Sequence, residues 1–454
     1  MTIPFAVPGA GPAVGGRRAT RTGTDSATGL LAPAVDAAVP GTWSATADLP
    51  FAGFWAQPDG AAVLLADGRV LIAGGEDGSR RPFADAALFE PVGGTWSRTG
   101  SLWDARRLHT STRLADGRVL VAGGIGTAPT FPAQGLASAE LYDPATGRWT
   151  RTGDLRRPRF SHSATLLTDG RVLVAGGSGA RSSQSNGSLR SAELYDPATG
   201  QWTETAPLTD ARFGHPAVRL NDGRVLLVGG ALTLGRGQYT ALGYCEAYNP
   251  ATGKWTPTAS LAGPRKSHQA TLLADGTVLV TGGDMPGFVP DSWTYDPYSQ
   301  WTAERYDPAK DLWSAEPAMP WGRSHHRTLR LTSGKVLMAG GTDDASFDIG
   351  YQNADVYDPV ARTWSADFPT VVGRWAPATV ALADGRALMF GGITLSGAAA
   401  PVVGESVITA TAEVFTLAGA GAGAGAGVAA AGGASGAESG AAPGASGATT
   451  GAAS

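Results

Sequence analysis

Arginine and histidine recur together along the chain, and these two side chains have the most chemical potential in the sequence. A histidine follows an arginine by three positions in the pairs Arg106/His109, Arg159/His162, Arg212/His215, Arg265/His268 and Arg323/His326. Arg374 is followed by Pro377 instead, and the first repeat holds Gln57 and Gly60 at these positions. A guanidinium can bind a carboxylate or phosphate through two parallel hydrogen bonds, and an imidazole can transfer protons near neutral pH. The series therefore predicts either a ligand site or a repeated structural unit.

Glycine pairs and tryptophans repeat with the same period as this series. The glycine pairs begin at Gly74, Gly123, Gly176, Gly229, Gly282, Gly340 and Gly391. The tryptophans that alternate with them are Trp43, Trp96, Trp149, Trp202, Trp255, Trp313 and Trp364. The spacing of roughly 50 residues is typical of β-propeller blades. Seven glycine pairs therefore predict seven blades.

The repeat over residues 159–204 indicates a four-stranded antiparallel sheet. Its segments SHSATLL, RVLVA, SAELY and QWTET are short and rich in Val, Leu, Thr and Tyr. Asp169 and Gly170 form a two-residue turn after the first segment, and DPATG forms a turn after the third. RVLVA is apolar on both faces, as expected for a blade that packs between two others. We predict an all-β, seven-bladed β-propeller.

The two ends of the repeat region complement each other. The first element is a lone fourth strand around Trp43, whereas the last repeat ends at its third strand, TAEVF. We expect residues 41–47 to complete the last blade, because this closes the ring and removes open sheet edges. The propeller would then span residues 41–417. We expect residues 1–40 to be flexible and the Gly/Ala-rich residues 418–454 to be disordered.

The glycine pair, the Tyr of SAELYDP, the Trp of GRWT and the upstream Arg-x-x-His together resemble the kelch motif, from about Trp43 to Phe415. Kelch propellers include both protein-binding modules and enzymes. Galactose-oxidase-like enzymes resemble the chain in architecture, and this resemblance implies a copper held by two Tyr and two His, with one Tyr crosslinked to a Cys. Cys245 lies in GYCEAY on a third strand, away from the channel, and the sequence has no Tyr-His dipeptide. We therefore expect no metal and no cofactor.

Composition excludes several classes of function. The formal net charge is −4, which gives no general attraction to nucleic acids or anionic membranes. Cys245 is the only cysteine, so the chain has no internal disulfide and no multi-thiolate metal site. The apolar N-terminal stretch is interrupted by prolines, and no segment is long and apolar enough to span a bilayer. We expect a cytoplasmic monomer.

The alternating strand directions place the Arg-x-x-His segments and the loops after the glycine pairs on one face. In one interpretation, a collar of arginines at the channel mouth binds an anionic ligand, through Arg106, Arg159, Arg212, Arg265, Arg323 and Arg374. In the other, these side chains bind loop carbonyls between blades, because repeated residues usually serve the repeat unit. The same face carries four tryptophans that either stack on a ligand or pack on their own loops, namely Trp293, Trp301, Trp321 and Trp375.

Two functions from different classes stay open at this point. The first is a binding or interaction scaffold that captures a protein segment or a small anionic ligand on its loop face. The second is a metal-independent small-molecule enzyme, an isomerase, cyclase or lyase, with a site at the channel mouth that is lined by the repeated arginines and histidines and uses a loop carboxylate for acid–base chemistry. The catalytic candidates are His109, His162, His215, His268 and His326, and the loop carboxylates are Glu76, Asp77, Asp284, Asp343 and Asp344. A histidine and a carboxylate within hydrogen-bond reach of each other would favour the enzyme. We expect the additional His325 to be structural.

Overall fold

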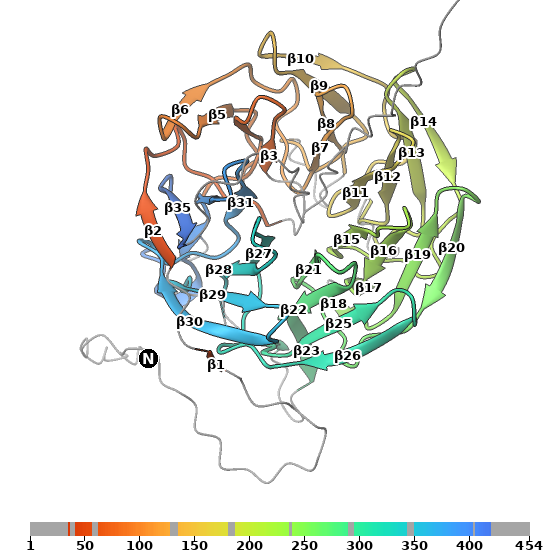
Figure 1. Cartoon of the computed structure of the whole chain (residues 1–454). Helices are drawn as coiled ribbons and strands as arrows, with labels where there is room; N and C mark the ends of the chain where they lie inside the picture. The colour runs from red at the N-terminus through yellow and green to blue at the C-terminus, as the bar shows by residue number, and fades with distance from the viewer. Residues whose placement is uncertain are drawn as a thin grey trace, which may run out of the picture. The chain divides into compact units, whose positions relative to one another are not determined.

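A computed structural model of the chain describes residues 35–36, 41–56, 62–127, 135–179, 187–235, 238–288, 295–342, 349–402 and 405–418. These residues belong to one compact unit, Leu31–Ser454. Seven antiparallel sheets surround a central axis, each with four strands of the repeat (Figure 1). The predicted fold, an all-β seven-bladed propeller, is confirmed.

The first three blades each use four consecutive strands. Blade 1 contains β3 (Ala62–Leu64), β4 (Val70–Ala73), β5 (Ala86–Glu90) and β6 (Thr95–Arg98). Blade 2 contains β7 (Thr110–Arg113), β8 (Val119–Ala122), β9 (Ala139–Asp143) and β10 (Arg148–Arg151). Blade 3 contains β11 (Ser163–Leu166), β12 (Val172–Ala175), β13 (Ala192–Asp196) and β14 (Gln201–Thr205).

The last four blades keep this order, and three of them have an inserted hairpin after the second strand. Blade 4 contains β15 (Ala217–Arg219), β16 (Val225–Val228), β19 (Cys245–Asn249) and β20 (Lys254–Thr258). Blade 5 contains β21 (Gln269–Leu272), β22 (Val278–Thr281), β25 (Ala303–Asp307) and β26 (Leu312–Glu316). Blade 6 contains β27 (Arg327–Arg330), β28 (Val336–Ala339), β29 (Asn353–Asp358) and β30 (Thr363–Pro369). Blade 7 contains β31 (Ala378–Ala381), β32 (Ala387–Phe390), β35 (Ala412–Leu417) and β2 (Gly41–Ala45).

Three two-stranded hairpins are inserted into blades 4, 5 and 7. They are β17 (Ala231–Gly235) with β18 (Gln238–Ala241), β23 (Asp284–Phe288) with β24 (Tyr295–Ser299), and β33 (Ile393–Leu395) with β34 (Val407–Ile408). A short 3-10 helix, η1 (Gly397–Ala399), follows β33. The strand β1 (Val35–Asp36) pairs in parallel with β30. Part of the N-terminal segment that we expected to be flexible therefore adds a fifth strand to blade 6.

The connections between strands divide between two faces of the propeller, because the strands of a blade are antiparallel. The loop face carries the loops from second to third strands. It also carries the links, by which we mean the segments that join the last strand of one blade to the first strand of the next. The hairpin face carries the turns from first to second and from third to fourth strands.

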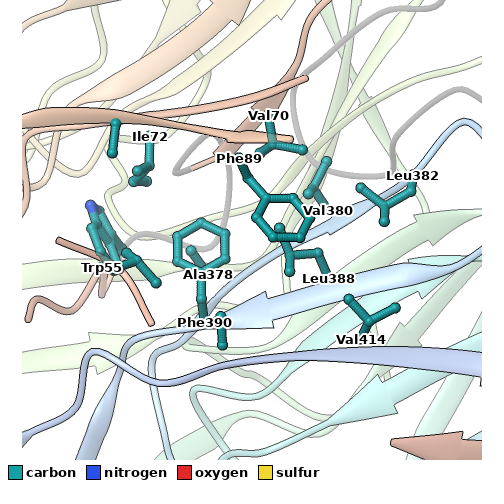
Figure 2. Close-up of a cluster of buried hydrophobic side chains, with 13 residues drawn as sticks. Trp55, Val70, Ile72, Phe89, Ala378, Val380, Leu382, Leu388, Phe390 and Val414 are labelled. Carbon is teal, nitrogen blue, oxygen red and sulfur yellow. The ribbon is translucent and has the colours of Figure 1, made fainter. Parts of the chain in front are cut away.

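The ring is closed by pairing between the two ends of the propeller. β2 pairs with β35 in antiparallel register, from Gly41 opposite Leu417 to Ala45 opposite Glu413. Blades 7 and 1 share a buried apolar cluster that includes Ile72, Phe89, Leu388 and Phe390 (Figure 2). Neighbouring first strands contact one another all the way round, including β3 with β31. The predicted completion of the last blade by residues near Trp43 is confirmed.

The repeated tryptophan packs between blades. In blade 3, the Trp202 ring lies 5.0 Å from the Tyr195 ring, and its indole N–H donates to the carbonyl of Gly153 in the preceding link at 2.8 Å. The Tyr195 hydroxyl is 2.7 Å from the Thr152 hydroxyl of that link. Buried aromatic rings with a satisfied polar group stabilise strongly. The equivalent bonds of Trp149, Trp255, Trp313 and Trp364 join the outer strands of blades 2, 4, 5 and 6 to the links before them.

The glycine pair allows the next link to pass against the blade. In blade 2, Gly123 has a φ of +63°, and a Cβ built on it would lie 2.5 Å from the carbonyl oxygen of Arg159. The amide of Gly124 donates to the same oxygen at 2.8 Å. A side chain at either position would push the link away, since only glycine tolerates both the angle and the approach. Each link passes against one glycine pair, so the glycine pairs and the links repeat with the same period.

We predict that a chain lacking residues 1–50 melts far below the intact protein, whereas a chain lacking residues 1–34 melts close to it. The longer deletion removes β2 and its contacts with β35, including the Trp43–Phe415 ring pair at 5.2 Å. Loss of several kcal/mol should lower the melting temperature by on the order of 10 °C. Thermal unfolding of both truncated chains measures this difference. Equal melting temperatures would refute closure by β2.

Candidate functional site

The six repeated arginines lie inside the blades. Each has at most 1 % of its surface exposed. In blade 3, Arg159 donates to the carbonyls of Gly176 at 2.7 Å and Ser191 at 2.9 Å, and to the Glu193 carboxylate at 2.7 Å. The Arg159 guanidinium therefore joins the second strand, the third strand and the link of its own blade.

The same ion pair recurs in six blades, with a carboxylate from the third strand that lies opposite the third residue of the second strand. The pairs are Arg106–Glu140, Arg159–Glu193, Arg212–Glu246, Arg265–Glu304, Arg323–Asp355 and Arg374–Glu413. Glu193 also accepts backbone N–H groups of the link, from Arg156 at 2.7 Å and Arg157 at 3.1 Å. Burial lowers the pKa of Arg159, and the adjacent Glu193 carboxylate opposes this shift. Each carboxylate thus holds both the arginine and the backbone of the link.

Sequence analysis did not select these carboxylates, although the sequence contains a signal for them. Blade 1 lacks both the arginine and the carboxylate. Ala87 occupies the position of the carboxylate, because it pairs with Ile72 as Glu193 pairs with Val174. Gly53 occupies the position of the arginine, because its carbonyl accepts the amide of Gly392 as the carbonyls of the arginines accept equivalent amides in the other blades. A buried charge without its partner costs several kcal/mol, so the two residues are kept or lost together.

Aromatic side chains replace the ion pair in blade 1. The indole of Trp55 donates to the carbonyl of Gly74 at 2.9 Å, which is the bond that an arginine makes in the other blades. Phe83 packs edge-on against Trp55, with ring centroids 6.4 Å apart. Sequence spacing placed Gln57 and Gly60 at the arginine and histidine positions of this blade, but both lie outside the described residues. The contacts of Gly53 show that Gly53, and not Gln57, stands at the arginine position. The spacing gave the wrong residue because the first link is longer than the others.

The repeated histidines are also buried, and they lie between blades. The Nε2 atom of His109 donates to the carbonyl of Ala73 in the preceding blade at 3.0 Å. The equivalent atoms of His162, His215 and His326 bond hydroxyl groups of Thr110, Ser163 and Thr281 in their preceding blades. His268 is buried in the same register.

Burial also controls the protonation of these histidines. It lowers the pKa of His109 to about 3, with the nearby Arg106 as a second cause, and it lowers the pKa of His162, His215, His268 and His326 well below the ordinary value. An effective acid–base catalyst at neutral pH has a pKa near the working pH. A catalytic role for these five histidines stays a prediction, and the described contacts do not favour it.

A ring of residues surrounds the channel mouth just before the histidine positions, and backbone hydrogen bonds join most of its neighbouring members. The residues immediately before the histidine positions have positive φ angles, namely Leu108, Ser161, Gly214, Ser267, His325 and Ala376. Amides of this ring donate to carbonyls in the preceding blade, as from Ser161 to Leu108 at 3.0 Å and from Ala376 to His325 at 2.9 Å. Trp55 donates to Ala376 at 3.2 Å and so continues the ring into blade 1. His325 thus has a structural place in this ring, as we expected.

Two ion pairs lie beside this ring on the loop face. Arg107 contacts Glu76 at 2.7 Å, and Lys266 contacts Asp284 at 2.5 Å. Burial raises the pKa of Glu76 to about 6 and raises the pKa of Asp284, and in each case the paired cation opposes the shift. Asp343 and Asp344 lie outside the described residues.

The four tryptophans predicted to bind ligand have different surroundings. Trp301 is 54 % exposed on the loop face, and Trp321 is half-buried. Trp375 is buried between Phe54 and His325, with ring centroids 6.4 Å and 5.5 Å away. Trp293 lies outside the described residues. Ligand binding by Trp301 stays a prediction, whereas the buried indole of Trp375 packs on the channel mouth.

The residues present do not fit the copper site of galactose-oxidase-like enzymes. Cys245 is buried on β19, its thiol donates to the carbonyl of Gly243 at 3.6 Å, and burial raises its pKa to about 11. Within the described part of the chain, no three His, Cys, Asp or Glu side chains gather in a way that could hold a metal ion. The described residues therefore supply no ligand set for copper.

We predict that Arg159→Met destabilises the fold by about 3–5 kcal/mol, because it leaves the buried Glu193 carboxylate without its cation. Adding Glu193→Gln should restore part of this loss, since the amide oxygen can still accept the N–H groups of the link. The urea midpoint of unfolding measures both effects. Arg171→Met is the control, because its pair with Asp169 is solvent-exposed and contributes about 0–1 kcal/mol. A loss as small for Arg159→Met as for Arg171→Met would contradict the structural role.

Comparisons with known proteins agree with this geometry. Residues 159–209 match the family model of the kelch motif. Kelch-like protein 34 of Homo sapiens is 26 % identical over 312 residues, which cover 64 % of this chain and 43 % of the human protein. Kelch-like protein terF of Aspergillus terreus is 29 % identical over 191 residues, which cover 40 % of each chain. The chain thus spans about two fifths of the length of these relatives.

A solved structure with the same fold is a novel fungal alcohol oxidase of the AA5 family in complex with copper. It superimposes with a TM-score of 0.61 at 18 % identity, over 83 % of this chain and 76 % of the oxidase. At this identity the likeness shows the fold alone. The closed ring of blades makes the chain a seven-bladed β-propeller, and the matches show that it carries a kelch motif and is similar to kelch-like proteins.

Proposed function

We propose that the chain is an interaction scaffold that captures a protein segment on its loop face. The observation that carries this proposal is the distribution of exposed apolar side chains. Among the described residues, most of the large ones lie on the loop face, namely Trp103, Leu234, Tyr244, Met285, Trp301, Ile349, Val371 and Val402. Exposed apolar groups gathered on one face are typical of protein-binding surfaces.

The inserted hairpins of blades 4 and 5 present part of this surface. β18 contacts β23, so the two hairpins stand next to each other above neighbouring blades (Figure 1). Leu234 on β17 is 55 % exposed, and Met285 on β23 is 39 % exposed. Tyr244 and Trp301 lie where each insertion returns to its blade, and they are 60 % and 54 % exposed. Exposed aromatic side chains of this kind commonly contribute most of the binding energy at an interface.

The hairpin face offers no comparable surface within the described part of the chain. Its first turns carry short-range ion pairs, such as Asp116 with Arg118 at 2.7 Å and Asp169 with Arg171 at 2.6 Å. Its exposed large apolar side chains stand singly in separate turns, at Val92, Leu312 and Val360. Scattered apolar residues of this kind need no binding role.

The buried network supports a scaffold in preference to an enzyme. The arginines and histidines of the repeat are used within and between blades, and no observation here favours the isomerase, cyclase or lyase alternative. The names of the relatives, as kelch-like proteins, are consistent with this proposal. Within the described residues, no helix is long and apolar enough to cross a membrane. We further propose that the scaffold acts as a cytoplasmic monomer.

We predict that peptides selected from a random display library against the intact protein bind the loop face through aromatic or aliphatic side chains. The double variant Tyr244→Ala/Trp301→Ala should weaken the affinity of a selected peptide at least tenfold, because each aromatic anchor contributes about 1–3 kcal/mol. Fluorescence polarisation with the labelled peptide measures the affinity.

The matched control is Leu312→Ala/Val360→Ala, which removes two exposed apolar side chains from the hairpin face. This variant should bind like the unmodified protein. If the control weakens binding as much as the loop-face variant, or if no peptide is selected, the proposal is wrong.

A further inference from the structure

The residue after each glycine pair lies opposite the residue after the repeated arginine or, in blade 1, after Gly53. These opposed residues form seven isolated β-bridges on the loop face, namely Phe54–Glu76, Arg107–Ile125, Phe160–Ser178, Phe213–Ala231, Lys266–Asp284, Ser324–Thr342 and Trp375–Ile393. Five of the seven residues after glycine pairs are uncharged. The other two, Glu76 and Asp284, are almost completely buried. A buried carboxylate is costly unless a cation pairs with it.

The ion pair of Asp284 stays within one blade, whereas the ion pair of Glu76 joins two blades. Asp284 contacts Lys266 at 2.5 Å, and both residues belong to the bridge of blade 5. The Oε2 atom of Glu76 in blade 1 lies 2.7 Å from the Nη1 atom of Arg107, which belongs to the link into blade 2. The Glu76 side chain is 3 % exposed and the Arg107 side chain is 21 % exposed. This contact between blades thus has a buried anion and a cation that reaches solvent.

Several titratable and charged groups lie on the elements around Glu76. Its own loop carries Asp77, Arg80 and Arg81, the link into blade 2 carries Arg106, Arg107 and His109, and blade 7 contributes Glu405 through its contact with Ser79. Arg106 is already paired with Glu140. Burial raises the pKa of Glu76 to about 6, Arg107 and Arg80 oppose this rise, and Asp77 adds to it. The carboxyl group of Glu76 therefore changes its charge between neutral and mildly acidic pH.

Protonation of Glu76 weakens the contact that holds the Arg107 side chain. An ionised carboxylate accepts a charge-assisted hydrogen bond from a guanidinium, whereas a neutral carboxyl group is a weaker acceptor. The backbone of Arg107 stays fixed, because its N–H and carbonyl both bond Ile125, at 3.0 Å and 2.8 Å. The guanidinium can therefore turn to solvent without movement of the link.

We propose that Glu76 and Arg107 form a proton-sensitive switch on the loop face, closed at neutral pH and open at mildly acidic pH. When closed, the ion pair joins the loop of blade 1 to the link into blade 2. When open, it releases the guanidinium, and the loop face carries one more positive charge. A partner segment would then meet a different surface, a consequence that rests on the proposed function. The switch itself does not depend on that function.

Nitrogen-15 NMR spectra of the arginine side chains in the full chain test the release of Arg107. The Arg107 Nε–H signal, identified by its absence from Arg107→Leu, should move between about pH 7.5 and about pH 5, with a midpoint near pH 6. Glu76→Gln should show the acidic position of this signal at both pH values, because an amide cannot ionise. The proposal is overturned if the signal does not move in the unmodified protein, or if it moves equally in Glu76→Gln.

Thermal unfolding provides a second readout. The pKa of Glu76 rises from 4.5 to about 6 on folding, so this group stabilises the fold as the pH falls through about 6 and destabilises it as the pH rises. Glu76→Gln should therefore melt about 2–4 °C above the unmodified protein at about pH 7.5. This difference should shrink to less than half by about pH 5.

The matched control is Asp169→Asn, which also replaces a carboxylate paired with an arginine, but at a solvent-exposed site. Partial burial acts to raise the pKa of Asp169, but the hydrogen bonds from Arg171 outweigh it and lower this pKa. The carboxylate of Asp169 thus stays ionised in this range, and the effect of Asp169→Asn on melting should be the same at both pH values. The proposal is also overturned if the melting difference of Glu76→Gln changes with pH no more than that of this control.

Discussion

The structure depends on one contact, repeated around the ring, between the link that enters each blade and the second and third strands of that blade. An arginine and a carboxylate make this contact in six blades, as Arg159 and Glu193 do in blade 3. The arginine binds the loop carbonyls that strand pairing leaves without a partner, and the carboxylate binds the amides of the link. Buried backbone groups must be paired, and here side chains supply the hydrogen bonds that a longer sheet would otherwise provide. The glycine pair then allows the following link to pass close by.

This arrangement separates stability from recognition. The repeated arginines and histidines are buried and make contacts within and between blades. They therefore stabilise the ring instead of facing a ligand. The insertions after the second strands are free to differ, because the Arg–carboxylate contact fixes the frame on which they stand. The exposed Tyr244 and Trp301, in blades 4 and 5, are examples of such variable residues on a constant frame. A repeat scaffold acquires a binding surface in this way without changing its core.

The sequence predicts the fold because its signals are local and periodic. Glycine pairs, turns and the tryptophan series each mark a blade, and the lone strand at Trp43 predicts how the ring closes. The site is harder to predict, since it depends on contacts between distant residues. Glu193 is 34 residues from Arg159, and only the joint absence of both partners from blade 1 reveals the pair. The assignment of Gln57 to the arginine position failed because the first link is longer than the other links. The packing of Trp375 on the channel mouth could not be predicted, since no spacing in the sequence indicates it.

Hydrogen–deuterium exchange of the unmodified protein tests the central claim most directly. The amides of Trp103, Asp104, Arg156 and Arg157 lie in links without regular secondary structure, and each donates to a buried carboxylate of the repeat. If the carboxylates hold the links, these amides should be protected to nearly the same degree as the neighbouring strands, because they exchange only when the blade opens. Exchange of these four amides at the rate of an unstructured peptide, with the strands still protected, would contradict the account.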